Sequence, residues 1–72
     1  MKVKKFISKL LSFNYHIWIT QNHFTIYEGD INEFIGIYVG TDLFNKKIKS
    51  FYFCRTQGID KIVIHIKDEK NE

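Results

Sequence analysis

The chain has no alanine, no proline, one arginine and one cysteine among its 72 residues. With one cysteine, Cys54, it cannot form an internal disulfide, although a secreted domain of this size usually carries several. The N-terminal segment is basic and partly apolar like a signal peptide, but Lys9 interrupts its apolar stretch and no small-residue cleavage site follows. No apolar run approaches the ~20 residues that cross a bilayer. We therefore expect a cytoplasmic protein without a membrane-spanning segment.

The missing residue types also indicate a kind of source. Alanine, proline and most arginine codons are GC-rich, whereas Ile, Lys, Asn, Phe and Tyr, which have AT-rich codons, supply more than half of the chain. The composition predicts an AT-rich genome, such as that of a low-GC bacterium or one of its phages or plasmids.

What is present is enough for one folded domain spanning residues 1–72. Apolar residues make up 44% of the chain and aromatic residues 17%, which argues against disorder. A chain of this length buries only about 60% of the surface that its unfolded form exposes. We expect a compact domain of modest stability.

The N-terminal residues 2–13 have the pattern of a short amphipathic helix. Their apolar positions follow the i, i+3, i+4, i+7, i+8 spacing of one helix face: Val3, Phe6, Ile7, Leu10 and Leu11. A basic helix of this kind can lie on an anionic membrane, but its apolar face is what a sheet needs for cover. We expect it to pack on the protein.

After this helix, β-branched and aromatic residues alternate with a period near two. The pattern predicts strands at about residues 15–20, 23–27, 33–39, 47–55 and 61–67, followed by an acidic tail at 68–72. Gly36, inside the third of these, suggests a bulge or a close approach of the backbone. Short connections favour antiparallel neighbours. The predicted fold is α+β: an N-terminal helix on a curved five-stranded antiparallel meander, either open or closed into a small barrel. One helix cannot cover both faces of such a sheet.

The first predicted hairpin has one apolar and one aromatic face. With a turn at Gln21 and Asn22, Ile19 would pair with Phe24 and Trp18 with Thr25. The polar aromatic face would gather a candidate partner-binding set: His16, Trp18 and Tyr27, extended by Tyr38, Tyr52 and His65 if their strands present them on the same side. Exposed Trp and Tyr suit a protein hot spot or base stacking. Alternatively, these rings cover the second side of a barrel core.

Charges fall in blocks along the chain. Residues 28–45 carry acids and no bases, whereas residues 46–67 carry six bases and Asp60. The six define a candidate basic surface, because their strands are expected to be neighbours: Lys46, Lys47, Lys49, Arg55, Lys61 and Lys67. This surface would either attract an anionic partner or keep edge strands soluble.

No catalytic or metal motif is present. His16 and His23 would lie about 13 Å apart along the hairpin at ~3.3 Å per residue, too far to share a zinc ion. Cys54 lies in an apolar strand and resembles a small buried hydrophobe more than an activated thiolate. We expect no enzymatic activity, no metal and no cofactor.

Two functions remain open from the sequence. The first is a small protein-interaction module, encoded by a phage or mobile element, that blocks a host defence protein such as a nucleic-acid-handling complex. Its analogy to anti-CRISPR proteins rests on size and composition alone. The second is a β-rich domain that binds RNA or single-stranded DNA through the same aromatics and the basic strand pair. Leftover apolar surface also leaves homodimerisation open.

Overall fold

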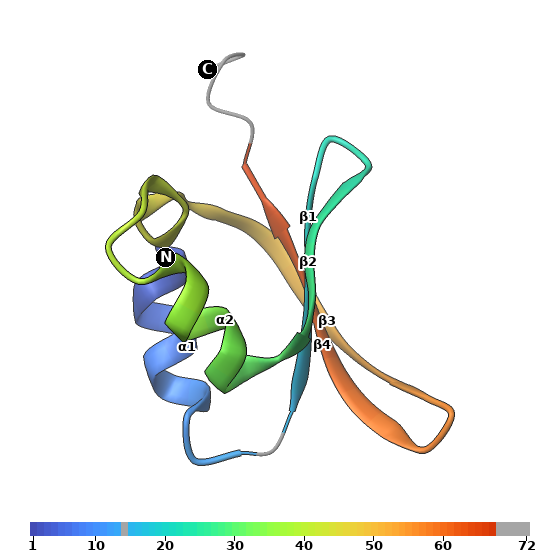
Figure 1. Ribbon diagram of the computed structural model, residues 1–72. Helices are drawn as coiled ribbons and strands as arrows, with labels where there is room; N and C mark the ends of the chain where they lie inside the picture. The colour runs from blue at the N-terminus through green and yellow to red at the C-terminus, as the bar shows by residue number, and fades with distance from the viewer. Residues whose placement is uncertain (14, 68–72) are drawn as a thin grey trace.

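The protein is an α+β domain, as predicted, in a computed structural model that describes residues 1–13 and 15–67 (Figure 1). The tail predicted at 68–72 lies outside the described residues. Over the described residues, two helices, a 3₁₀ turn and four strands follow one another: α1 (Val3–Leu10), β1 (His16–Gln21), β2 (Phe24–Asp30), α2 (Ile31–Tyr38), η1 (Asp42–Asn45), β3 (Ile48–Thr56) and β4 (Ile59–Ile66). The predicted N-terminal helix is therefore real but ends at Leu10.

The described strands form one open sheet in the order β2-β1-β4-β3. The two hairpins β1–β2 and β3–β4 are antiparallel, and β1 and β4 pair in parallel at the centre. The prediction of a five-stranded antiparallel meander is therefore wrong, and the sheet does not close into a barrel. Because β4 inserts beside β1, the edges are β2 and β3.

Residues 33–39, predicted as a strand, belong mainly to helix α2. The side chain of Asp30 caps this helix by accepting hydrogen bonds from the backbone N–H groups of Asn32 and Glu33. Ile31 and Phe34 are buried three residues apart, as helical spacing requires. The isoleucines of this segment imitate the alternation of a strand, whereas the pattern of Asp30 followed three residues later by Glu33 is a helix-start signal. Gly36 consequently lies in a helix and marks no bulge.

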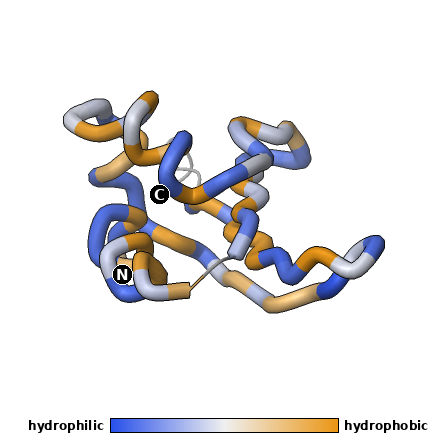
Figure 2. The backbone as a smooth tube through the Cα atoms, turned by 60° about the horizontal axis from the view of Figure 1, so that its bottom comes forward, coloured by the Kyte–Doolittle hydropathy of each residue, from blue (hydrophilic) through white to orange (hydrophobic). Residues whose placement is uncertain are grey.

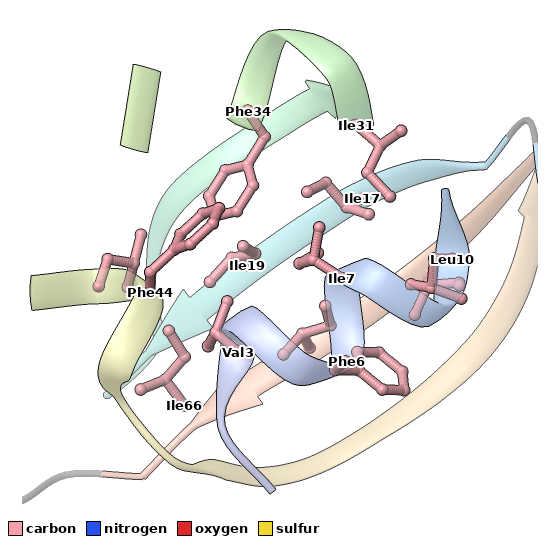
Figure 3. Close-up of a cluster of buried hydrophobic side chains, with 13 residues drawn as sticks. Val3, Phe6, Ile7, Leu10, Ile17, Ile19, Ile31, Phe34, Phe44 and Ile66 are labelled. Carbon is pink, nitrogen blue, oxygen red and sulfur yellow. The ribbon is translucent and has the colours of Figure 1, made fainter. Parts of the chain in front are cut away.

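Both helices cover the same face of the sheet (Figure 1). In Figure 3, side chains of α1 point toward the isoleucines of the sheet, and Phe34 of α2 lies over Phe44 of η1. This layer and the sheet enclose one hydrophobic cluster, in which Val3, Ile17, Ile19, Ile62 and Ile64 are almost completely buried. The opposite face carries no helix among the described elements.

The first hairpin has a different register from the predicted one. Its turn is formed by Asn22 and His23, both with positive φ (52° and 69°), so Gln21 pairs with Phe24. A bulge follows, because Thr20 pairs with Thr25 whereas Ile19 pairs with Tyr27. The predicted pairs were wrong because the turn lies one residue later and the bulge inserts Ile26.

The first residues of the chain pair with the start of β3. The N–H of Val3 donates to the carbonyl of Lys46, and the N–H of Ile48 donates to that of Met1. From the other side, the N–H of Lys67 donates to the carbonyl of Lys47. Residues near both ends of the described chain therefore flank Lys47.

Hydrophobic and hydrophilic residues alternate along the backbone rather than forming one continuous apolar stretch (Figure 2). Over the described residues, neither helix has the length and apolar character that crossing a membrane requires.

Candidate interaction surface

The sheet face away from the helices presents a grid of side chains in three rows, which we call the open face. Residues paired directly across strands share a face, so the register defines the rows. The grid consists of alternate residues of three adjacent strands: His16, Trp18 and Thr20 from β1, Lys61, Val63 and His65 from β4, and Cys54, Tyr52 and Ser50 from β3.

The central row consists of one aliphatic residue with an aromatic residue on each side. Val63 pairs with Trp18 in β1 and with Tyr52 in β3. Val63 is only 2% exposed, whereas Tyr52 is 51% exposed. The indole Nε1 of Trp18 donates a hydrogen bond to Oγ1 of Thr25 in β2 at 3.0 Å, which fixes the ring against the sheet. The row is an ordered apolar centre with polar ring atoms at its margin.

An ion pair lies next to the indole. Lys61 Nζ donates to Glu28 Oε2 at 2.9 Å and lies 5.9 Å from the centre of the Trp18 ring. The side chain of Lys61 is only 16% exposed. Its charge is balanced by the carboxylate and directed over the ring, so it is engaged within the protein.

The third row borders a polar pocket of ≈ 390 Å³. Thr20 Oγ1 and His65 Nδ1 are 2.6 Å apart, and the His65 ring lies 5.9 Å from that of Tyr52. The remaining lining residues are also polar: Asn22, His23, Lys49 and Ser50. Lys49 and the two imidazoles, His23 and His65, are the titratable groups that line this pocket.

The first row is formed by His16, Lys61 and Cys54. His16 is half-buried and pairs with Lys61 on one side and Asp30 on the other. Cys54 is a half-buried free thiol. It is therefore less buried than the sequence suggested.

The open face thus brings together four of the six residues predicted to bind a partner: His16, Trp18, Tyr52 and His65. Tyr27 and Tyr38 are not among them. Tyr27 pairs with Ile19 on the helix side of the sheet, and its ring lies 5.2 Å from Phe34 and 6.0 Å from Tyr38 of α2. Tyr27 lies on this side of the sheet because the bulge in β2 shifts the register by one residue.

Tyr27 has a structural role in this position. Its hydroxyl donates to the carbonyl of Asp30 at 2.8 Å, next to the first turn of α2. Burial raises the pKa of the Tyr27 hydroxyl above its ordinary value, and the carboxylates of Glu33 and Asp30 raise it further. The ring therefore supports the junction between β2 and α2 as a neutral phenol.

The six residues of the predicted basic surface do not form one patch. Arg55, at the tip of the β3–β4 hairpin, pairs with Asp60 (3.2 Å), and Lys61 pairs with Glu28. Lys46, Lys47 and Lys67 lie at the opposite end of β3, where their backbones are hydrogen-bonded to one another or to Val3. Lys49 lines the polar pocket. The two strands are neighbours, as expected, but the charge is divided between their ends.

The exposure of β3 is a feature that was not predicted from the sequence. Three successive aromatic residues on this edge strand are each about half exposed: Phe51 (45%), Tyr52 (51%) and Phe53 (58%). The run of three rings was visible in the sequence, but the edge position of its strand follows from the parallel pairing of β1 with β4.

The described residues contain no group of three or more His, Cys, Asp or Glu side chains close enough to hold a metal ion. Comparisons of the chain with protein-family models, characterised proteins and solved structures gave no match.

Proposed function

We propose that this chain is a non-catalytic protein-interaction module whose open face docks on a partner protein. The observation that supports this proposal is the central row, in which Trp18 and Tyr52 flank the buried Val63 on a face without a helix. Large rigid rings around an apolar centre give much contact area for little loss of side-chain entropy. Trp and Tyr are accordingly enriched at the energetic centres of protein interfaces.

The charges near this row favour a protein over a phosphate backbone. Lys61, the cation over the Trp18 ring, is paired with the carboxylate of Glu28. A nucleic acid would have to compete with Glu28 for this cation. A mixed polar rim around aromatic residues is typical of protein interfaces.

The mode of action that we propose is occlusion. A small chain that binds through one face can cover a surface of a larger host protein and inhibit it without chemistry of its own. The AT-rich composition and small size support an origin in a phage or other mobile element, with a defence protein in the host cytoplasm as the target. This part of the proposal rests on the composition.

The test begins with the immobilised chain and a lysate of a low-GC bacterium, and continues with the captured protein after identification and purification. Trp18→Ala and Tyr52→Ala should each weaken binding of that purified protein at least tenfold. Phe24→Ala is the matched control, because Phe24 is 75% exposed next to the β1–β2 turn and lies outside the open-face grid. Wild-type affinity in both open-face variants, with circular dichroism showing them folded, would contradict docking on this face.

A second candidate function is binding of single-stranded nucleic acid, and the polar pocket favours it. Lys49, His23 and His65 line this pocket beside Tyr52, so a phosphate in the pocket would place a neighbouring base near that ring. Fluorescence anisotropy with oligothymidylate and oligouridylate at about 50 mM and about 200 mM salt tests it. Binding that falls steeply with salt and is lost in Lys49→Ala supports this function, and no binding at the lower salt contradicts it.

A further inference from the structure

Residues 50–56 of β3 form an outer edge of the sheet that no other described strand pairs with. The N-terminal residues pair with the beginning of this strand, up to Ile48, and a bulge lies between Ile48 and Ser50. Beyond the bulge, residues 50–56 pair regularly with β4 on their inner side. On their outer side, no strand of the described part of the chain pairs with them.

The outward backbone groups of this stretch follow from its hairpin. Gln57 and Gly58 form a two-residue turn with positive φ (55° and 79°), so Thr56 and Ile59 are the hydrogen-bonded pair that closes it. Hydrogen-bonded and non-hydrogen-bonded pairs alternate along an antiparallel ladder. The N–H and C=O groups of Phe51, Phe53 and Arg55 consequently point away from β4 and toward solvent.

This edge has little of the protection that edge strands usually carry. Natural edges are blunted by charged residues, prolines or covering segments. Between the bulge and the turn, Arg55 is the single charged residue, and Asp60 already pairs with it. The other positions include the three half-exposed aromatic residues Phe51, Tyr52 and Phe53.

We propose that a second copy of this chain pairs with this edge, β3 against β3 in antiparallel orientation, about a two-fold axis at Phe53. Phe53 is the midpoint of residues 50–56, so this register uses the whole regular stretch of both copies. Phe51 then lies opposite Arg55 of the second copy, and Tyr52 lies opposite Cys54. The product is one continuous eight-stranded sheet.

The charges on β3 favour the register centred on Phe53 over the one centred on the neighbouring residue Tyr52. A register centred on Tyr52 would place Lys49 directly opposite Arg55 of the second copy, which is unfavourable. With the axis at Phe53, the two Arg55 side chains are four residues apart, about 13 Å. This distance exceeds the Debye length of ~8 Å, so their repulsion is screened. Each guanidinium instead lies beside a Phe51 ring, which it can contact favourably.

The apolar surface next to the edge fits the same arrangement. Phe51 and Phe53 lie on the helix side of the sheet, in contact with one another, and a chain of rings runs from Phe53 through Tyr15 to Phe13. A two-fold axis perpendicular to the sheet keeps the helices of both copies on one side. The phenylalanines of each copy then cover those of the other, and the open faces join. The dimer is independent of the proposed docking of a partner protein.

Sedimentation equilibrium of the full chain tests the association. We expect the wild type to dimerise over a series reaching on the order of 100 μM. Phe53→Glu, which places two carboxylates on the axis, should weaken dimerisation at least tenfold. Phe24→Glu makes the same change at an exposed position away from β3 and should leave it intact. A wild type that is monomeric throughout the series, or equal weakening by both variants, would overturn the proposal.

Disulfide trapping tests the register. In the proposed dimer, residue 52 faces Cys54 of the second copy in a non-hydrogen-bonded pair, with Cα atoms about 4.5 Å apart, within reach of a disulfide. Tyr52→Cys should therefore give a covalent dimer in a glutathione buffer, and adding Cys54→Ser should abolish it. Ser50→Cys is the matched control, because residue 50 faces Thr56. Trapping by Ser50→Cys instead of Tyr52→Cys would refute the Phe53 axis.

Discussion

Thr20 and His65 are 45 residues apart in the chain and are joined by a hydrogen bond of 2.6 Å between Oγ1 and Nδ1. They are directly paired across β1 and β4, the parallel strands at the centre of the sheet. Both side chains lie on the open face. This bond links the two hairpins.

Thr20→Val should lower the free energy of unfolding by about 1 kcal/mol. Valine keeps the β-branched shape that suits a strand, so the loss reports the hydroxyl and its partner. Thr56→Val, at the exposed end of β3, is the control and should change stability by less than half as much. Urea unfolding of both variants measures the difference, and equal effects would show that the Thr20–His65 bond contributes little.

Asp30→Ala should lower the free energy of unfolding by about 1 kcal/mol, because the first turn of α2 loses the side chain that accepts two N–H groups. Asp30→Asn retains the capping oxygen and should be close to wild type. Asp42→Ala removes an acid from the first turn of η1 without removing a side-chain cap. If Asp30→Ala and Asp42→Ala unfold at the same urea concentration, the loss of stability in Asp30→Ala does not come from the loss of the helix cap.

Gly36→Ala should raise the free energy of unfolding by about 1 kcal/mol. Gly36 lies inside α2, and a Cβ added there meets no atom within 4 Å. Alanine thus reduces the freedom of the unfolded chain without a clash in the folded one. Gly40→Ala is the contrasting variant. Gly40 has φ of +80°, which a residue with a Cβ rarely adopts, so this variant should be less stable than the wild type. Thermal unfolding distinguishes the two, and a lower melting temperature for Gly36→Ala would contradict the helix.

The Tyr27 hydroxyl should make the protein less stable in alkali. Its pKa in the folded protein is raised above 10.0, so its contribution is complete below pH 10 and is lost as the pH rises through the folded pKa. Tyr27→Phe removes this dependence and the hydrogen bond to Asp30, at a cost of about 1 kcal/mol near neutral pH. Urea unfolding from pH 7 upward should show the two proteins converging above pH 10, and a constant difference would refute the raised pKa.

The local features of this fold were largely readable in the sequence. The apolar stripe of α1 and the alternation of Ile62, Ile64 and Ile66 are strong periodic signals, and both elements were found. Helix α2 was not found, because its isoleucines mimic the alternation of a strand. The signal that identifies it as a helix is the N-cap at Asp30. The parallel pairing of β1 with β4 depends on packing of the two hairpins and leaves no local mark.

The candidate site shows the same division. Trp18 and Tyr52 were predicted to share a surface, and the structure places them in one row. Tyr27 was misplaced because a bulge of one residue moves every following side chain to the other face. Strand β3 could not be recognised as an edge until its neighbours were known.

The central parallel pair has a consequence for the order of folding. Each hairpin closes through a two-residue turn, on a timescale of about 1–10 μs. Pairing of β1 with β4 instead brings together residues 45 apart in the sequence, such as His16 and Lys61. We expect folding to proceed as the collision of two preformed hairpins, with the seam between β1 and β4 closing last and opening first. Amide protons along that seam should therefore exchange by a separate, lower-energy opening than those within either hairpin.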